Sequence, residues 1–231
     1  MEEGRKHRGL VRIYLDLETY RPVKEGSFTR EDIILIGLLV DGSEVMYEPL
    51  ENFELEDVKR FDEEREILLR FYKYLKKILR EGYSIEIIGF NNLRFDIPLI
   101  VSKTLRHNIV KDVFGSELKE ERRITGRYVH SADFINKWWH SIYTIDLAQV
   151  LLSFNMFRFK ELKLETMAKR LNEKFECKIE VQEKFNLGGE NIAELFKNGR
   201  FEEIEKKNIA DLRVIRDIYQ CLKKICTIAH F

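Results

Sequence analysis

Apolar residues in the first half of the chain fall mostly in short runs that are typical of β-strands. Residues 10–17 alternate between apolar and polar positions and then become apolar, which favours a central strand. Similar runs predict further strands at residues 33–40, 45–48, 84–90 and 142–147. Asp41-Gly42 stands between the first two of these runs and predicts a hairpin turn.

Elsewhere apolar residues recur at the three- and four-residue spacing with which a helix buries one face. The clearest example runs from Asp62 to Arg80, where charged residues occupy the opposite face. The same spacing predicts helices at residues 98–107, 147–154, 162–171, 192–196 and 201–225. This order of elements predicts an α/β fold in which helices flank a mixed β-sheet.

Length and composition favour one folded domain. The 231 residues suffice for one sizeable α/β core but are too few for two ordinary domains. Apolar residues make up 44% of the chain, so we expect a packed core rather than disorder. We predict a short polar extension at residues 1–9 and a single domain at 10–231. Residues 110–141 show no clear period and are expected to form an irregular insert.

Charge and cysteine usage bear on the cellular setting. The formal net charge is zero, so the total does not indicate a nucleic-acid binder, although a site with several carboxylates can hide basic patches in that sum. No apolar run approaches the ~18 residues of a membrane span, and residues 1–10 are too polar for a signal peptide. Cys177, Cys221 and Cys226 show no metal-ligand or redox spacing and suggest a reducing compartment. We therefore expect a soluble cytoplasmic protein with no membrane partner.

Two acidic residues are notable within the first predicted strand and just beyond it. Asp16 and Glu18 are two positions apart, so both side chains point to one face of the sheet. In apolar surroundings they would repel each other and resist desolvation, and a bound cation would remove both difficulties. The alternative is a strand that reaches solvent, with both carboxylates hydrated.

Asp96 and Asp211 are the other acidic candidates. Asp96 lies between a predicted strand and a predicted helix, where its structural alternative is a helix N-cap. Asp211 lies near the apolar stripe of the last predicted helix, where an acid needs a partner. The alternative to a role as metal ligand is an ion pair. Carboxylates that converge from separate elements suit Mg²⁺ or Mn²⁺, which prefer oxygen ligands. Two such ions about 3.5–4 Å apart can stabilise the attacking and leaving oxygens of a displacement at phosphorus.

The order and spacing of these acids resemble the DEDD superfamily of 3′→5′ exonucleases, in particular the exonuclease domains of family-B DNA polymerases and their stand-alone relatives. Asp16 and Glu18 match the first family motif, Asp-x-Glu. Asn91 to Asp96 matches the second motif, Asn-x-x-x-Phe-Asp, and Asp211 matches the third, an aspartate on a late helix. The similarity spans about residues 10–224 and implies a ribonuclease-H-like fold.

The resemblance implies a metal-dependent 3′→5′ exonuclease with two Mg²⁺ or Mn²⁺ ions per site, held by Asp16, Glu18, Asp96 and Asp211. The substrate would be single-stranded DNA, or RNA, with a free 3′ end, and the products would be nucleoside 5′-monophosphates. Proofreading would need a separate polymerase or repair partner. One alternative is a catalytically weak or inactive nucleic-acid-binding module on the same fold, and another is an endonuclease.

One position departs from the family pattern. Relatives carry Tyr four residues before the last Asp, or His five residues before it, and these positions hold Lys207 and Lys206 here. The family residue helps to orient or deprotonate the attacking water, whereas lysine is a poor base unless burial lowers its pKa of about 10.4. Lys207 is therefore a candidate catalytic residue. A phosphate contact, a sign of weak activity and a solvated helix lysine are the alternatives.

Substrate contacts are expected around the first two motifs. Thr19 follows the first motif directly, and Asn91 and Asn92 belong to the second, so these three are candidate substrate-binding residues. The segment 122–139 mixes basic residues with aromatic ones, a composition that suits single-strand binding. The same composition is also typical of a solvated loop held by buried tryptophans.

Overall fold

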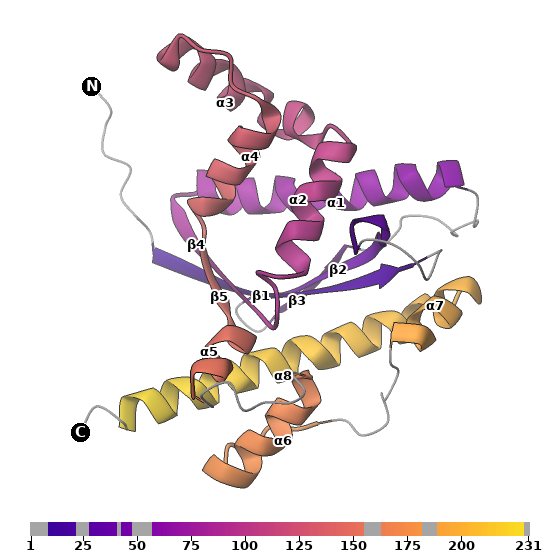
Figure 1. Cartoon of the computed structure of the whole chain (residues 1–231), viewed down its shortest axis with the longest axis vertical. Coiled ribbons are helices and arrows are strands. Elements are labelled where there is room, and N and C mark those ends of the chain that lie inside the picture. The colour runs from indigo at the N-terminus through magenta and orange to yellow at the C-terminus, as the bar shows by residue number, and fades with distance from the viewer. Residues whose placement is uncertain are drawn as a thin grey trace.

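Five strands form one mixed sheet through the middle of the molecule, in the order β3-β2-β1-β4-β5 (Figure 1). They are β1 (Gly9–Tyr20), β2 (Asp32–Val40), β3 (Ser43–Tyr47), β4 (Tyr83–Gly89) and β5 (Tyr143–Asp146). β2 runs antiparallel to β1 and β3, whereas β4 runs parallel to β1 and β5. The computed structural model describes residues 9–21, 28–40, 43–47, 57–154, 163–181 and 189–228. All five predicted strands are present, and the predicted turn at Asp41-Gly42 lies outside the described residues.

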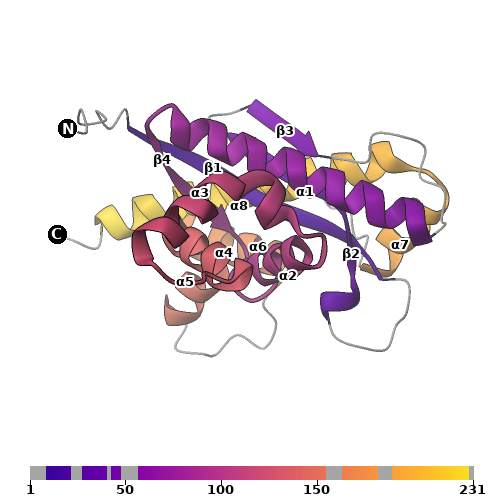
Figure 2. The same ribbon diagram turned by 90° about the horizontal axis from the view of Figure 1, so that it is seen from above.

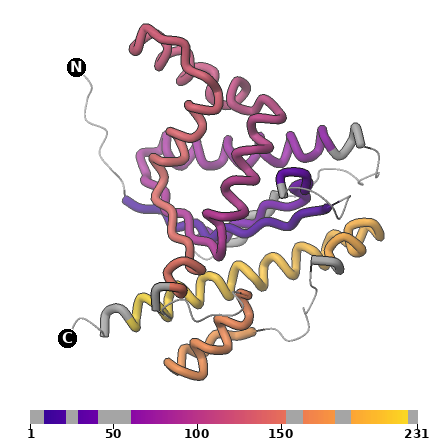
Figure 3. Tube along the Cα trace, viewed as in Figure 1, coloured from indigo at the N-terminus to yellow at the C-terminus, as the bar shows by residue number. Residues whose placement is uncertain are grey.

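Helices cover both faces of the sheet (Figures 1 and 2). The first helical layer consists of α1 (Asp57–Arg80), α2 (Asp96–Arg106), α3 (Ile109–Thr125) and α4 (Ser131–His140). The second helical layer consists of α5 (Leu147–Phe154), α6 (Leu164–Phe175), α7 (Gly189–Lys197) and α8 (Phe201–Ile228). A short 3₁₀ helix, η1 (Phe28–Arg30), precedes β2, and β5 leads the chain from the first layer to the second (Figure 3). In the described part of the chain, no helix combines the length and apolarity that crossing a membrane requires.

Side chains of β1 alternate between two hydrophobic cores. Ile13 and Leu15 belong to the core that packs against the first helical layer. Tyr14 belongs to the core on the opposite face, which contains apolar residues of α8. Asp16 and Glu18 continue the even-numbered positions of the strand, so they lie on the face that α8 covers.

Residues 110–141 are mostly helical, which corrects the expectation of an irregular insert. They make up most of α3 and all of α4, and α3 contains a kink at Phe114, where φ and ψ are −117° and 16°. The buried residues of α3 are Ile109, Val110, Phe114 and Leu118, and none of residues 119–125 is buried before Gly126, with a φ of 65°, ends the helix. The second half of α3 therefore shows no apolar period in the sequence.

A disulfide bond joins Cys177, which follows α6, to Cys221 in α8. Their Cα atoms are 5.6 Å apart, although the residues are separated by 44 positions in the sequence. This pairing differs from the unpaired, reduced cysteines that the sequence analysis expects. No local spacing encodes the pair, because the two cysteines meet only after α6 has packed against α8.

Candidate metal centre

β1 places Asp16 and Glu18 next to each other on one face of the sheet. In the ladder with β2, Asp16 lies opposite Gly37 and Glu18 lies opposite Leu35. The register shifts between Glu18 and Thr19, so regular pairing is interrupted directly after the two acids. Glu18 is only 4% exposed, so the alternative of two hydrated carboxylates does not hold for it.

The helix α8 crosses this face and brings Asp211 to the same place. One oxygen each of Asp16, Glu18 and Asp211 lies within 4.8 Å of the other two. We call these three residues the carboxylate cluster. The Asp211 side chain is 27% exposed, so solvent reaches the cluster. Oxygen atoms of several carboxylates at such spacing are the ligands that hard divalent cations bind.

Asp96 lies beside the carboxylate cluster but outside it. It is the first residue of α2 and is 5% exposed. Its carboxylate accepts hydrogen bonds from its own backbone N–H and from the N–H of Leu17, which ties the start of α2 to β1. The N-cap of α2 is Phe95, so the simple capping alternative does not describe Asp96. The charge of Asp96 acts on Asp16 and raises its pKa.

Burial and mutual repulsion make these carboxylates difficult to ionise. Burial raises the pKa of Asp16 well above its ordinary value, and the charges of the other three acids raise it further. Burial also raises the pKa of Glu18, although Lys207 partly offsets this effect. The pKa of Asp96 rises to about 7, because of burial and repulsion from neighbouring carboxylates. All three pKa values are raised, which indicates that the site has too little positive charge. A divalent cation would supply that charge, so these carboxylates fit a metal ion.

Lys207 brings one positive charge into the carboxylate cluster. It lies one helical turn before Asp211, and its Nζ donates to Glu18 Oε1 at 2.8 Å and to Asp211 Oδ2 at 2.9 Å. Burial opposes the charged form, but the charges of Glu18 and Asp211 outweigh burial and raise the pKa of Lys207 above its ordinary value. In this arrangement Lys207 is neither a solvated helix lysine nor a base whose pKa burial has lowered.

Asn208 is a site residue to which the sequence analysis assigns no role. Its side chain is fully buried, and Nδ2 donates to Asp16 Oδ2 at 2.8 Å. The amide also hydrogen-bonds to Glu18. It fits here because Gly37 has no side chain: a Cβ at Gly37 would lie 1.6 Å from Asn208 Oδ1. A glycine inside an apolar strand is a signal of close approach that could have pointed to this contact.

The three candidate substrate contacts differ in accessibility. The hydroxyl of Thr19 donates to Glu31 Oε2 at 2.6 Å, so it is engaged within the protein. Asn91 is exposed, has a left-handed φ of 65°, and donates its backbone N–H to Asp146 Oδ1 at 2.8 Å. Asn92 is fully buried, so the structure gives it a packing role rather than an accessible surface.

Residues 35–216 match the model of a protein family described as "Predicted 3'-5' exonuclease related to the exonuclease domain of PolB". The match covers most of the chain. The chain belongs to this family. The matched region of this exonuclease family includes Asp96, Lys207 and Asp211, whereas Asp16 and Glu18 precede it. The two acids of β1 lie outside the matched region, and folding brings them next to Asp211, which lies inside it.

Among solved structures, this member of the exonuclease family is similar to the family B DNA polymerase from the hyperthermophilic archaeon Pyrobaculum calidifontis, with a TM-score of 0.53 and 14% sequence identity. The similarity covers 92% of this chain and 24% of the polymerase, so the chain spans about a quarter of the polymerase's length. At this identity the similarity shows the fold, which is the predicted ribonuclease-H-like one. No curated protein matches the chain.

In this exonuclease-family chain, basic side chains of the segment 122–139 are engaged in ion pairs within the protein. Arg123 donates to both carboxylate oxygens of Glu120, and Lys137 donates to Glu121 at 2.6 Å. The indole of Trp139 is buried rather than available for stacking on a base. The composition therefore reflects ion pairs and core packing as well as any contact with nucleic acid.

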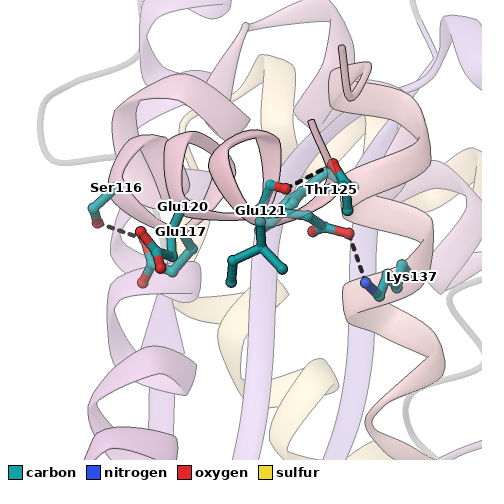
Figure 4. Close-up of a pocket in the computed structure, with 8 residues that line it drawn as sticks. Ser116, Glu117, Glu120, Glu121, Thr125 and Lys137 are labelled. Atoms are coloured by element: carbon teal, nitrogen blue, oxygen red, sulfur yellow. Dashed lines mark hydrogen bonds and ion pairs between the residues drawn. The ribbon is translucent and has the colours of Figure 1, made fainter. Parts of the chain in front are cut away.

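A surface pocket of about 600 Å³ lies between α3 and α4 in the first helical layer (Figure 4). Its walls include three glutamates, and Lys137 at its edge points toward one of them. The Ser116 hydroxyl donates to Glu117 at 2.7 Å, so polar groups of the wall bond to each other. An acidic wall disfavours a phosphate backbone, and we assign no nucleic-acid contact to this pocket.

Proposed function

We propose that the protein is a divalent-cation-dependent 3′→5′ exonuclease that hydrolyses single-stranded DNA, with RNA as a second substrate class, to nucleoside 5′-monophosphates. The observation that carries the proposal is the carboxylate cluster, in which oxygens of Asp16, Glu18 and Asp211 lie within 4.8 Å of one another. Membership in a family of predicted 3′–5′ exonucleases supports the same reaction. We further propose that the protein acts in the cytoplasm, alone or with a separate polymerase or repair partner.

In this proposal the carboxylate cluster holds one Mg²⁺ or Mn²⁺ ion, and Asp96 together with Asp16 contributes to a second. Bound divalent cations would lower the pKa of water and offset the charge that develops on the departing 3′ oxygen. Asn208 orients Asp16 through its amide, which limits the carboxylate to one rotamer. The hydrogen bond from Leu17 N–H to Asp96 ties the start of α2 to β1, so it holds Asp96 beside the strand that carries Asp16 and Glu18.

The 3′-terminal nucleotide would bind next to the carboxylate cluster, between the end of β1 and the loop before α2. Asn91 is the exposed candidate of that loop, and its left-handed backbone is held by Asp146. We propose that Asn91 contacts the terminal nucleotide through its amide. Thr19 would contribute through its backbone, because its hydroxyl is bonded to Glu31.

The test is degradation of end-labelled linear oligonucleotides in the presence of Mn²⁺. With a 5′ label, the wild-type protein should give a ladder that shortens with time, and with a 3′ label it should release labelled mononucleotide first. Asp16→Ala should slow both by at least about a hundredfold, because charge stabilisation by a metal is worth several kcal/mol. Asp217→Asn is a matched control, since Asp217 lies on α8 and pairs with Arg216.

Equal degradation by wild type and Asp16→Ala, or none by either, would rule out the proposed catalysis. Cleavage of circular single strands, which have no ends, would assign the protein to endonucleases instead. DNA and RNA versions of each oligonucleotide separate the two substrate classes.

A nucleic-acid-binding module with little turnover is the second candidate function. The observation that favours it is Lys207, which occupies the position of the family's tyrosine and holds Glu18 and Asp211 in ion pairs. This function predicts oligonucleotide binding by fluorescence anisotropy without any shortening of the bound strand. Degradation that depends on Asp16 would exclude it.

A further inference from the structure

Lys207 and its neighbour Lys206 lie in contrasting environments on the same helix, one largely buried and the other exposed. The Lys206 side chain is 64% exposed and lies 3.7 Å from Glu202. The Lys207 side chain is 15% exposed, and its Nζ lies within hydrogen-bonding distance of both Glu18 and Asp211. One lysine therefore has a solvated charge, whereas the other has its charge held between two members of the carboxylate cluster.

A divalent cation in the cluster needs oxygens that Lys207 already uses. Lys207 contacts two of the three carboxylates, and the oxygens of all three lie within 4.8 Å of one another. An ammonium group has three donors and no acceptor, so it cannot itself coordinate a metal. An ion among these oxygens would also lie close to a like charge, and at such separations Coulomb repulsion is strong. The two cations therefore exclude each other.

We propose that Lys207 is a built-in competitor of the divalent cation. Its ammonium partly offsets the charges of Glu18 and Asp211 in the free protein and must leave them before the carboxylate cluster binds Mg²⁺ or Mn²⁺. The flexible four-carbon stem of lysine allows the group to turn toward solvent. The inference rests on the proposed metal-dependent function. It has two consequences: Lys207 stabilises the acidic cluster without metal, and it weakens the affinity for metal.

The test is calorimetric titration of the whole protein with Mn²⁺ in the absence of nucleic acid. Lys207→Met removes the charge and keeps an unbranched side chain, Lys206→Met makes the same change one residue away, and Lys207→Arg keeps the charge. Lys207→Met should bind Mn²⁺ on the order of tenfold more tightly than wild type, because one nearby positive charge is gone. The other two variants should stay close to wild type.

Thermal unfolding gives a second measurement that does not depend on activity. In EDTA, Lys207→Met should unfold at a lower temperature than wild type, because its carboxylates repel each other without a counter-charge. Saturating Mn²⁺ should remove that difference. Lys206→Met should match wild type in both conditions.

The outcomes separate this inference from the function on which it rests. If Lys207→Met binds Mn²⁺ as wild type does, or more weakly, the competitor role is wrong while the metal centre stands. If wild type binds Mn²⁺ no better than Asp16→Asn, the metal centre itself is overturned.

Discussion

At the scale of residues, Asn208 packs against Gly37 and donates to Asp16, so a glycine and an asparagine help to position the acids. The shared face of Asp16 and Glu18 could be predicted, because a spacing of two along a strand places side chains on one side. The approach of Asp211 to them could only be inferred from the family resemblance, since it comes from a helix near the other end of the chain. The contact of Asn208 with Gly37 joins α8 to β2, and the glycine inside an apolar strand indicates a close approach without indicating which residue makes it.

Gly37→Ala tests the contact between β2 and α8. The added Cβ would lie 1.6 Å from Asn208 Oδ1, so the amide must move and its hydrogen bond to Asp16 is lost. We expect a loss of about 1–3 kcal/mol in the free energy of unfolding, which is typical of overpacking, together with weaker Mn²⁺ binding. Urea denaturation and calorimetry measure the two effects.

Two variants serve as controls for this prediction. Gly115→Ala adds the same methyl group inside α3, where nothing lies within 4 Å, so it should leave Mn²⁺ affinity unchanged and should raise stability by about 0.5–1 kcal/mol rather than lower it. Combining Gly37→Ala with Asn208→Ala makes room for the Cβ, so stability should partly recover while metal binding stays weak. Wild-type Mn²⁺ affinity in Gly37→Ala would mean that the Asn208 amide does not orient Asp16.

At the scale of elements, Glu64 of α1 links three segments in the first helical layer. Its Oε1 accepts the backbone N–H of Ile33 in β2 at 2.8 Å and lies 3.0 Å from Lys103 Nζ in α2. Its Oε2 lies 2.5 Å from Nε2 of His107, which follows α2. In the sequence Glu64 is one of many charged residues on an amphipathic helix, so this role could not be predicted from the pattern.

Glu64→Gln should make the free energy of unfolding less sensitive to a fall in pH. Burial alone would raise the pKa of Glu64, but the hydrogen bond with His107 and the charge of Lys103 outweigh it and lower the pKa below its ordinary 4.5. A lowered folded-state pKa contributes stability above pH 4.5 that is lost as the pH falls through the folded value. Removing the charge leaves fully buried Lys103 with Asp32, 3.1 Å away, as its charged partner, so we expect a loss of roughly 1–3 kcal/mol near pH 7.

Denaturation of wild type and Glu64→Gln between pH 3 and 7 measures this difference. The difference in the free energy of unfolding between the two proteins should be largest at neutral pH. It should shrink at the acidic end, where Glu64 is protonated in both the folded and the unfolded state. Glu66→Gln, on the same helix, is the control and should change little. A gap that is constant across the whole range would contradict the lowered pKa.

The disulfide between Cys177 and Cys221 ties the end of α6 to α8. A bond that closes a loop of 44 residues restricts the unfolded chain, so reduction should cost up to about 4 kcal/mol of unfolding free energy. Denaturation with and without a reductant measures this, and Cys177→Ser should not respond to the reductant. Three free thiols in the denatured, unreduced wild-type protein would show that the bond does not form.

The elements themselves were predictable wherever one hydrophobic period continued without interruption. The last helix was expected at residues 201–225 and extends from Phe201 to Ile228. The prediction failed in α3, because its buried residues end at Leu118 and no residue of its last seven positions is buried. Periodicity therefore predicts a helix only where a buried apolar face runs along most of its length.

At the scale of the whole molecule, the pattern predicted a mixed sheet with flanking helices but did not establish the strand order. That order places β1 at the centre, with β2 on one side and β4 on the other. The central position allows α8 to cross above Asp16 while α2 begins beside the same strand. The net charge of zero conceals this arrangement, because it adds the local acidic cluster to basic residues elsewhere.

Diffraction from crystals grown with excess Mn²⁺ tests most directly whether the acids of β1 and α8 form a metal centre. We predict an anomalous peak roughly 2 Å from carboxylate oxygens of Asp16, Glu18 and Asp211, with Lys207 Nζ displaced from its present partners. An anomalous map with no peak between β1 and α8, and with Lys207 still bonded to Glu18 and Asp211, would contradict the account.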